Sequence, residues 1–327
     1  MSGLKKSFFV LTAALGCTAS AVTRVGIVGL DTSHAPKFAA LLNGEKPLPE
    51  AKDFRVTAAY PWGSRTIKSS YERIPKYTEE VKKLGVEIVD SIPALLGKCD
   101  CVLLETNDGR DHLAQALEVF KAGKPVFIDK PLAASLKDCV AIVEAAKKYN
   151  AKWFTASSLR YLTGVQAARR GEYGKLRGIA TTSPESYEPT HSLFYWYAIH
   201  GAEPIFAAFG RGCETVCCLT SDDGDVIIGK WADGKLSSQR ALRFDRKGAD
   251  GAYAGIIYTE QGPKDVGTRE GYEPLVVRIL DFYRTGVAPI DPEETLEVFA
   301  YMEAAAESRA KGGVPVALKD VLERARQ

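Results

Sequence analysis

Between residues 23 and 157 the sequence alternates short apolar segments with amphipathic ones, and this alternation constrains the fold more than any other feature. Helical spacing is clear at 112–123 and 135–150, which lie between runs of β-branched and apolar residues. Strands that alternate with helices form βαβ units and a parallel sheet buried on both faces. We therefore predict an α/β fold class with a doubly wound parallel sheet, whose strands lie at 24–30, 54–60, 99–106, 125–130 and 152–157.

The pattern changes after residue 157. Strand-like segments now follow one another across Gly- and Asp-rich turns, which favours an antiparallel sheet. We predict a first domain at 22–157 and a second at 158–327, an α+β domain with a mostly antiparallel open sheet. The second domain would supply substrate and oligomer contacts, and its C-terminal helix would pack back on the first domain. Its strands are predicted at 176–183, 213–220, 225–231, 236–244 and 251–259, and its helices at 192–210, 272–286 and 292–313.

Residues 1–21 have the layout of a secretory signal peptide. Lys5 and Lys6 precede an apolar run, and small residues at 19–21 suit cleavage. The run is too short for a transmembrane span. We predict export, to the periplasm of a bacterium. A cytoplasmic chain with an N-terminal extension is the alternative, and a lipid anchor at Cys17 is a second one, although Ala14 departs from the usual lipoprotein pattern.

Charge and cysteine content narrow the function classes. Forty-three basic residues against 41 acidic ones give a formal net charge of +2, with no basic run in the body of the chain, so nucleic-acid binding has no electrostatic support. The seven cysteines show no zinc-site spacing, and most are expected to be buried thiols. If the chain is exported, a disulfide within the cluster Cys213, Cys217 and Cys218 remains open.

Three motifs in this order resemble the Gfo/Idh/MocA oxidoreductases. "FIDKPLA" at 127–133 is similar to the family's Glu-Lys-Pro strand end, with Asp129 in place of the glutamate. "TNDGRDHLAQAL" at 106–117 is similar to its strand-end loop followed by a histidine and a helix. "HGAE" at 200–203 is similar to its His-x-x-Asp helix. The resemblance extends over the chain from Thr23 onward.

The resemblance implies an N-terminal Rossmann domain with a nicotinamide cofactor, NAD or NADP, across the carboxyl ends of its strands. It also implies a sugar or cyclitol substrate. Lys130 would lie at the nicotinamide edge, and His200 would give or take the substrate's proton. We name these two residues as the catalytic candidates, and we expect a homodimer or a larger homo-oligomer.

The first turn departs from the dinucleotide pattern. In "GIVGLDTSH" at 26–34, Gly29 is the first glycine, while Asp31 and His34 stand where the second and third glycines would be. An aspartate there places negative charge beside a pyrophosphate, which is unfavourable unless it is screened or protonated. The candidate cofactor-binding residues are Gly29, Asp31, Thr32, Ser33, His34, Ser64, Arg65, Thr106, Asp129 and Lys130.

The second strand ends in "AAYPWGSR" without an acid for the ribose hydroxyls. Ser64 and Arg65 could instead bind a 2′-phosphate, which makes NADP easier to accommodate than NAD. A simple turn with an exposed arginine is the alternative.

The substrate side also departs from the family. The family's dehydrogenases carry Asp-x-Gly-x-His, but Trp196 occupies the aspartate position before His200. Glu203 lies on the same helical face as His200 and is expected to orient its imidazole, unless both are structural. Aromatic side chains suit stacking on a sugar ring. The candidate substrate residues are Arg160, Tyr161, Tyr187, Trp196 and Glu203.

Three functions remain open from the sequence. The first is a nicotinamide-dependent oxidoreductase acting on a sugar or cyclitol by hydride exchange. The second is a non-redox lyase, isomerase or hydratase acting on a ketosugar, with the same lysine and histidine moving protons. The third is a sugar-binding protein without catalysis. No metal is predicted; a set of His34, Asp31, His112 and Glu105 is a minor alternative that no fixed ligand spacing supports.

Overall fold

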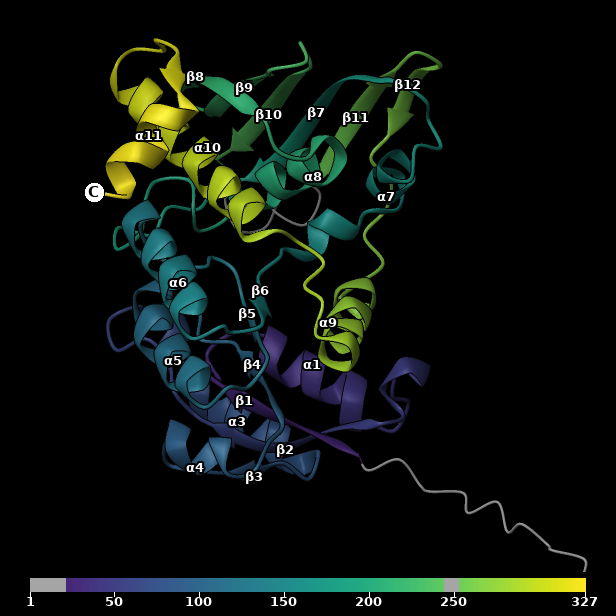
Figure 1. Cartoon of the computed structure of the whole chain (residues 1–327), viewed down its shortest axis with the longest axis vertical. Coiled ribbons are helices and arrows are strands. Elements are labelled where there is room, and N and C mark those ends of the chain that lie inside the picture. Colours follow the sequence, from purple (N-terminus) through teal and green to yellow (C-terminus); the bar gives the residue numbers. More distant parts are fainter. Residues whose placement is uncertain (1–21, 244–252) are drawn as a thin grey trace, which may run out of the picture.

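The computed structural model describes residues 22–243 and 253–327, which form two domains (Figure 1). The predicted signal peptide and Cys17 lie outside the described residues. Within the described ranges, no helix has the length and apolar character needed to cross a membrane.

The first domain is built on a six-stranded parallel sheet in the order β3-β2-β1-β4-β5-β6. The last four residues of β1 and all four of β4 are buried, as expected of strands covered on both faces. The predicted doubly wound parallel sheet is confirmed. Its strands are β1 (Thr23–Val28), β2 (Phe54–Tyr60), β3 (Glu87–Ile88), β4 (Cys101–Leu104), β5 (Val126–Ile128) and β6 (Trp153–Phe154).

Helices cover both faces of this sheet, and several begin at a side-chain cap. Asp108 caps α5 by accepting from the Arg110 N–H, and Ser135 caps α6 by accepting from the Asp138 N–H. The helices are α1 (His34–Asn43), α2 (Lys68–Tyr71), α3 (Ile74–Lys83), α4 (Ile92–Leu96), α5 (Gly109–Lys121) and α6 (Leu136–Lys148), with 3₁₀ turns η1 (Pro49–Ala51) and η2 (Ser158–Tyr161).

The second domain carries a seven-stranded sheet in the order β12-β11-β7-β10-β9-β8-β13. Only the β10–β7 pair is parallel, so the predicted mostly antiparallel sheet is confirmed. Its strands are β7 (Leu176–Pro184), β8 (Cys213–Ser221), β9 (Gly224–Trp231), β10 (Leu236–Leu242), β11 (Ala254–Thr259), β12 (Gly262–Asp265) and β13 (Val316–Ala317).

Helices α8 (Ile199–Phe209) and α10 (Pro292–Ala310) lie between the second sheet and the first domain, whereas α9 (Glu273–Thr285) lies beside α1 of the first domain (Figure 1). The helix predicted at 192–210 begins only at Ile199, because Ser192 donates its backbone N–H to Ala134 of the first domain and the following residues form turns. The helices are α7 (Thr163–Arg169), α8 (Ile199–Phe209), α9 (Glu273–Thr285), α10 (Pro292–Ala310) and α11 (Leu318–Ala325).

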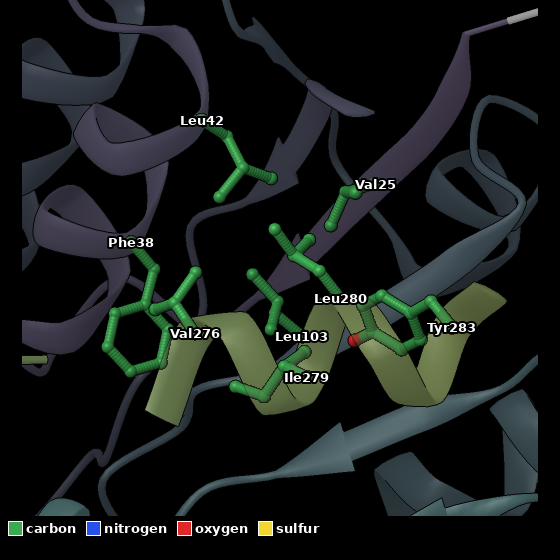
Figure 2. Close-up of a pocket in the computed structure, with 8 residues that line it drawn as sticks. All are labelled: Val25, Phe38, Leu42, Leu103, Val276, Ile279, Leu280 and Tyr283. Atoms are coloured by element: carbon green, nitrogen blue, oxygen red, sulfur yellow. The ribbon is translucent and has the colours of Figure 1, made fainter. Parts of the chain in front are cut away.

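Helix α9 joins the two domains. Tyr283 donates from its hydroxyl to the Val102 carbonyl at 2.5 Å, and Arg284 pairs with Asp53 at 2.7 Å. Figure 2 shows apolar side chains of α9 facing those of β1, α1 and β4 around a small cavity. Near the C-terminus, α10 and α11 contact α6 of the first domain. The relative placement of the domains is therefore fixed by apolar packing as well as by ion pairs.

The cysteines of the described ranges are all free, and all but Cys217 are buried. This agrees with the expectation that most of them are small core residues.

Candidate active site at the carboxyl edge of the parallel sheet

The residues singled out from the sequence gather where β1, β2, β4 and β5 end. Gly29 follows β1 with φ +94°, and a Cβ added to it would lie 2.4 Å from the Thr106 backbone nitrogen after β4. Only glycine suits this turn, because the backbone is left-handed and the next loop is in contact. Position 29, which the sequence predicted as the first glycine of the turn, thus has to be glycine because it lies against the loop that follows β4.

The Asp31 carboxylate ties together the loops after β2 and β4. It is fully buried, and it accepts the Ser64 N–H at 3.0 Å and the Asn107 N–H at 2.9 Å. Burial raises the pKa of Asp31 to about 7, although the two backbone N–H groups oppose the rise. The negative charge that the sequence placed beside a pyrophosphate is therefore turned inward onto protein donors.

The segment after β2 crosses this edge and is bonded on both sides. The Leu30 N–H donates to the Trp62 carbonyl at 2.8 Å, and the Ser64 hydroxyl donates to Asp108 at 2.7 Å. Although burial opposes it, hydrogen bonds from Arg110 and Ser64 lower the pKa of Asp108 to about 2. The Ser64 hydroxyl is thus bonded within the protein and stabilises the loop, whereas the sequence predicted that it would contact a phosphate.

Arg65 and Trp62 lie at the outer side of this segment. The Arg65 guanidinium lies 4.4 Å from the centroid of the Trp62 ring, whose indole N–H donates to Asp111 at 2.8 Å. A surface pocket beyond them is lined by Tyr60, Trp62, Ile92 and Gln115. This pocket lies at the ends of β2 and β3, and Asp31 is not among the residues that line it.

A dinucleotide bound along this edge would have to fit between these residues. The turn at Gly29 fits one, and the pocket beside Tyr60 offers space for a flat ring. The pyrophosphate would have to pass α1, where Asp31 fills the position of the second glycine and its hydrogen bonds close the space between the loops. The residues present therefore do not fit a bound dinucleotide in this arrangement.

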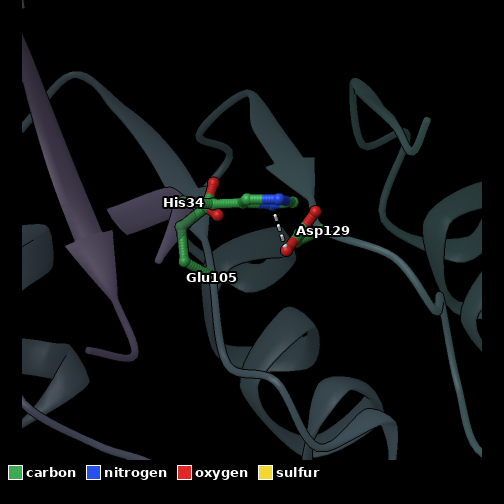
Figure 3. A group of neighbouring side chains, drawn as sticks. All are labelled: His34, Glu105 and Asp129. Carbon is green, nitrogen blue, oxygen red and sulfur yellow. Dashed lines mark hydrogen bonds and ion pairs between the residues drawn. The ribbon is translucent and has the colours of Figure 1, made fainter. Parts of the chain in front are cut away.

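His34, Glu105 and Asp129 form a buried cluster beside the closed edge (Figure 3). His34 donates from Nδ1 to Asp129 Oδ2 at 2.8 Å. Burial would raise the pKa of Asp129, but His34 and Lys130 hold it below its ordinary value. Burial, and then the Asp129 carboxylate, raise the pKa of Glu105 well above its ordinary value. Neither Glu105 oxygen has a hydrogen-bond partner among the described residues.

The two catalytic candidates lie on the second-domain side of this cluster. Lys130 is 9% exposed, and its Nζ lies 5.4 Å from the centroid of the Tyr197 ring. His200 Nδ1 shares a hydrogen bond of 2.6 Å with the Ser157 hydroxyl, and its ring lies between those of Tyr197 and Tyr253. Burial, and then Lys130 and His34, hold the pKa of His200 well below its ordinary value. His200 is therefore a neutral, positioned imidazole.

Of the two roles left open for Glu203, the structure shows the structural one, an ion pair with Arg160. Its carboxylate accepts from Arg160 Nε at 2.8 Å instead of orienting His200, and Arg160 also pairs with Glu294 of α10. Arg160 is 1% exposed, and its charge is balanced by the buried Glu203 carboxylate and the partly buried Glu294 carboxylate. Arg160 and Glu203, predicted as substrate residues, are engaged with each other because the buried guanidinium requires partners. The group that orients His200 is Ser157.

Three further predicted substrate residues are dispersed. Tyr161 lines a surface pocket with Gln166 and Arg278, and Tyr187 is 60% exposed. The Trp196 ring packs against His191 at a centroid distance of 4.9 Å. The structure does not bring these aromatic side chains together with Lys130 and His200. Tyr197 and Tyr253, which the sequence reasoning missed, take that position beside His200.

The remaining predicted residues belong to loops around the cluster. Thr32 accepts weakly from the His34 N–H at 3.4 Å, and Ser33 precedes α1 without capping it through its side chain. Thr106 is buried next to Glu105. Both ring nitrogens of His112 face backbone carbonyls, those of Leu132 and Thr106, so this histidine is not a member of a metal set.

Sequence reasoning also missed Asn107 and Asp108. Both follow β4 within "TNDGRDH", and the capping preference of aspartate before a helix was the available signal. The pairing of Asp108 with Ser64 joins loops 44 residues apart in the chain. Such a contact depends on the sheet order and not on local pattern.

The strand order and the turn after β1 define a class of protein: a Rossmann domain of the dinucleotide type joined to an open-sheet α+β domain. Residues 23–157 match the family described as GFO_IDH_MocA, oxidoreductase family, NAD-binding Rossmann fold. This first domain is therefore a Rossmann domain of the Gfo/Idh/MocA oxidoreductase family, a family that binds NAD(P).

Solved structures share the whole fold. A probable dehydrogenase from Thermotoga maritima superimposes with a TM-score of 0.70 at 20% identity, covering 91% of this chain and 99% of that one. The scyllo-inositol dehydrogenase from Lactobacillus casei, solved with NAD(H) and scyllo-inositol, gives a TM-score of 0.69 at 16% identity, with coverage of 91% and 99%. At sequence identities this low, the superpositions show a common fold alone.

Curated relatives match over shorter stretches. The 2,7-anhydro-N-acetylneuraminate hydratase of Escherichia coli is 32% identical over 84 residues, which is 25% of this chain and 22% of that protein. Three such relatives, this hydratase among them, are matched over only 19% to 24% of their own length. These matches place the chain among relatives that include dehydrogenases and a hydratase by name.

Proposed function

We propose that this protein acts on a sugar or cyclitol that carries a carbonyl group, and that it moves protons without exchanging hydride with a bound dinucleotide. The observation that carries the proposal is the Asp31 carboxylate, whose hydrogen bonds to Ser64 and Asn107 close the edge where a pyrophosphate would lie. The reaction class is a lyase, isomerase or hydratase on a ketosugar. The similarity of the fold to an inositol dehydrogenase supports the substrate class.

The chemistry of the pair Lys130 and His200 supports proton transfer. A neutral imidazole can take a proton from carbon next to a carbonyl, and a lysine ammonium stabilises the enolate oxygen that develops. Hydrogen bonding to Ser157 fixes the His200 ring, and the tautomer decides whether Nε2 is a base or an acid. The neutral state of His200 suits it for the first step near neutral pH.

A second candidate is the family's nicotinamide-dependent oxidoreductase activity on a sugar or cyclitol. The match of residues 23–157 and the turn at Gly29 favour it, as does the pocket at Tyr60. It requires the segment after β2 to move away from Asp31 when the cofactor binds. NADP would then be held in part by Arg65. A sugar-binding protein without catalysis is the outcome if neither activity is found.

Two measurements on the purified chain separate these functions. Calorimetric titration with NAD⁺, NADH, NADP⁺ and NADPH is expected to give no binding at submillimolar concentration. Incubation in D₂O with a ketohexose and with a keto-inositol is expected to introduce deuterium next to the carbonyl, detected by NMR. His200→Asn and Lys130→Met are expected to abolish this exchange, whereas Lys147→Met, at an exposed lysine of α6, is expected to retain it.

Submillimolar binding of any of the four dinucleotides, together with reduction or oxidation of the sugar, would establish the second candidate. Exchange that persists in both Lys130→Met and His200→Asn would remove these residues from the reaction. Absence of both exchange and dinucleotide binding, with retained affinity for a sugar, would leave the binding function.

We also propose export and self-association. The order of Lys5 and Lys6, an apolar run and small residues at 19–21 supports export by the general secretory route. Large apolar side chains stay exposed on the second sheet, which supports a homodimer or larger homo-oligomer. They are Leu219, Ile228, Ile256 and Tyr258. N-terminal mass after fractionation tests the first proposal, and light scattering of the purified chain tests the second.

A further inference from the structure

We propose that His34, Glu105 and Asp129 form the binding site of a divalent transition-metal ion such as Zn²⁺ or Mn²⁺, beside Lys130 and His200. One ring nitrogen of His34 and one oxygen of each carboxylate lie within 4.8 Å of one another. The three residues come from the start of α1 and the ends of β4 and β5, and Figure 3 shows their side chains converging.

Three buried carboxylate oxygens of Glu105 and Asp129 have no hydrogen-bond partner among the described residues, which points to a bound ligand shielded from solvent. Glu105 is 0% exposed, and both of its oxygens lack a hydrogen-bond partner among the described residues. Asp129 Oδ1, in a residue that is 1% exposed, lacks one as well. A buried carboxylate without partners is strongly unfavourable, whereas a cation between the two carboxylates would satisfy all three oxygens.

The geometry is close to that of a metal site with an open position. Ligand atoms about 2.0–2.2 Å from a tetrahedral zinc ion lie about 3.4 Å apart. The three candidate ligand atoms lie within 4.8 Å of one another, so an ion would draw them closer together. Imidazole and carboxylate donors without thiolate suit Zn²⁺ and Mn²⁺. Three protein ligands leave a coordination position free for a water or a substrate oxygen, which is typical of catalytic sites.

The charges around the cluster are compatible with an ion. Two carboxylates and an imidazole balance a 2+ ion, and the Lys130 ammonium is the opposing charge nearby. Lys130 lies 5.4 Å from the Tyr197 ring centroid, so an aromatic face shares in stabilising it. An ion in this position would polarise a substrate carbonyl or hydroxyl oxygen held next to His200. This inference stands apart from the proposed reaction, because metal affinity is measured without a substrate.

The test is a calorimetric titration of the tag-free chain, stripped with a chelator, using Mn²⁺ and Zn²⁺ near neutral pH. One ion per chain with micromolar or tighter affinity is expected. Glu105→Gln keeps the shape of the side chain and is expected to weaken binding at least ~10-fold. Asp100→Asn changes a carboxylate that pairs with Arg24 just before β4, at the opposite end of the strand from Glu105, and is expected to bind as the unaltered chain does. Mn²⁺ avoids the thiols, which prefer softer ions.

A second measurement keeps the test valid if Glu105→Gln fails to fold. The Co²⁺-loaded chain is expected to show visible absorption bands of a low-coordinate nitrogen- and oxygen-ligated ion, and His34→Ala is expected to change their position and intensity. Failure of Mn²⁺, Zn²⁺ and Co²⁺ to bind at millimolar concentration would overturn the proposal. Affinity and Co²⁺ spectrum unaltered in Glu105→Gln and His34→Ala would also overturn it.

Discussion

Replacing Asp31 by asparagine separates the charge of this buried side chain from its shape. The variant keeps one oxygen to accept a backbone N–H, as the protonated carboxyl does. We expect the free energy of unfolding of Asp31→Asn to match that of the unaltered chain at acid pH and to exceed it increasingly as the pH rises. The reason is that the carboxylate is ionised in the folded protein only above about pH 7.

The sign and size follow from the pKa. A carboxyl whose pKa is raised in the folded state contributes stability that is complete below its unfolded pKa and is lost as the pH rises through the folded pKa. The rise from 3.8 to about 7 on folding corresponds to about 4 kcal/mol, at roughly 1.4 kcal/mol per tenfold change in proton affinity. Between pH ~5 and ~8, about 3 kcal/mol of this difference should appear.

The assay is urea unfolding at a series of pH values, followed by fluorescence and far-UV circular dichroism for both proteins. Comparison at each pH removes the titration of other groups, of which Asp108 and Glu105 are the nearest acids. Asp100→Asn is the control of opposite sign, because Arg24 lowers the pKa of Asp100. A difference between Asp31→Asn and the unaltered chain that stays flat, or that reverses with rising pH, would refute the assignment of Asp31 as a carboxyl disfavoured in its charged form.

Three further substitutions test separate parts of the structure. Arg160→Met leaves the buried Glu203 and the partly buried Glu294 without their cation and is expected to lower the free energy of unfolding by about 3–5 kcal/mol in urea, whereas Arg170→Ala at an exposed pair is expected to leave it unchanged. Gly29→Ala combines a positive φ with a backbone clash and is expected to destabilise by about 3 kcal/mol or more, measured in the same way. Burial lowers the pKa of His191 to about 4, so stability is complete above pH ~6.5 and falls by up to about 3 kcal/mol toward pH ~4. His191→Gln should lose this dependence; equal pH profiles for the two proteins would contradict it.

The fold was accessible from the sequence because its signals are local. The alternation of strand and helix patterns gave the parallel sheet, and the predicted strand at 54–60 matches β2 at both ends. The start of α8 could not be predicted from the sequence. Its apolar spacing extends back to residue 192, but the tie between Ser192 and Ala134 of the other domain competes with helix formation there.

The candidate site could be predicted from the sequence only in part, because its contacts join residues far apart in the chain. Motif order placed Lys130, His200 and His34 at one edge, and the structure brings them together. The sequence did not indicate which side chain Glu203 binds. Glu203 lies one helical turn from His200, yet its carboxylate pairs with Arg160. A buried guanidinium binds a carboxylate more strongly than a neutral imidazole does, and the position of Arg160 depends on how η2 meets α8.

The two departures in the first turn have different consequences, and together they favour proton transfer. Asp31 faces the loops after β2 and β4, and its hydrogen bonds close the part of the edge where a pyrophosphate would lie. His34 faces the other way, toward Asp129 and Glu105, in the half where the resemblance places nicotinamide. A return of glycine at position 31 alone would open only the first half, because the acidic cluster would still occupy the second. The edge that holds one long ligand in a dinucleotide enzyme is thus divided into a closed structural half and a charged half next to Lys130 and His200.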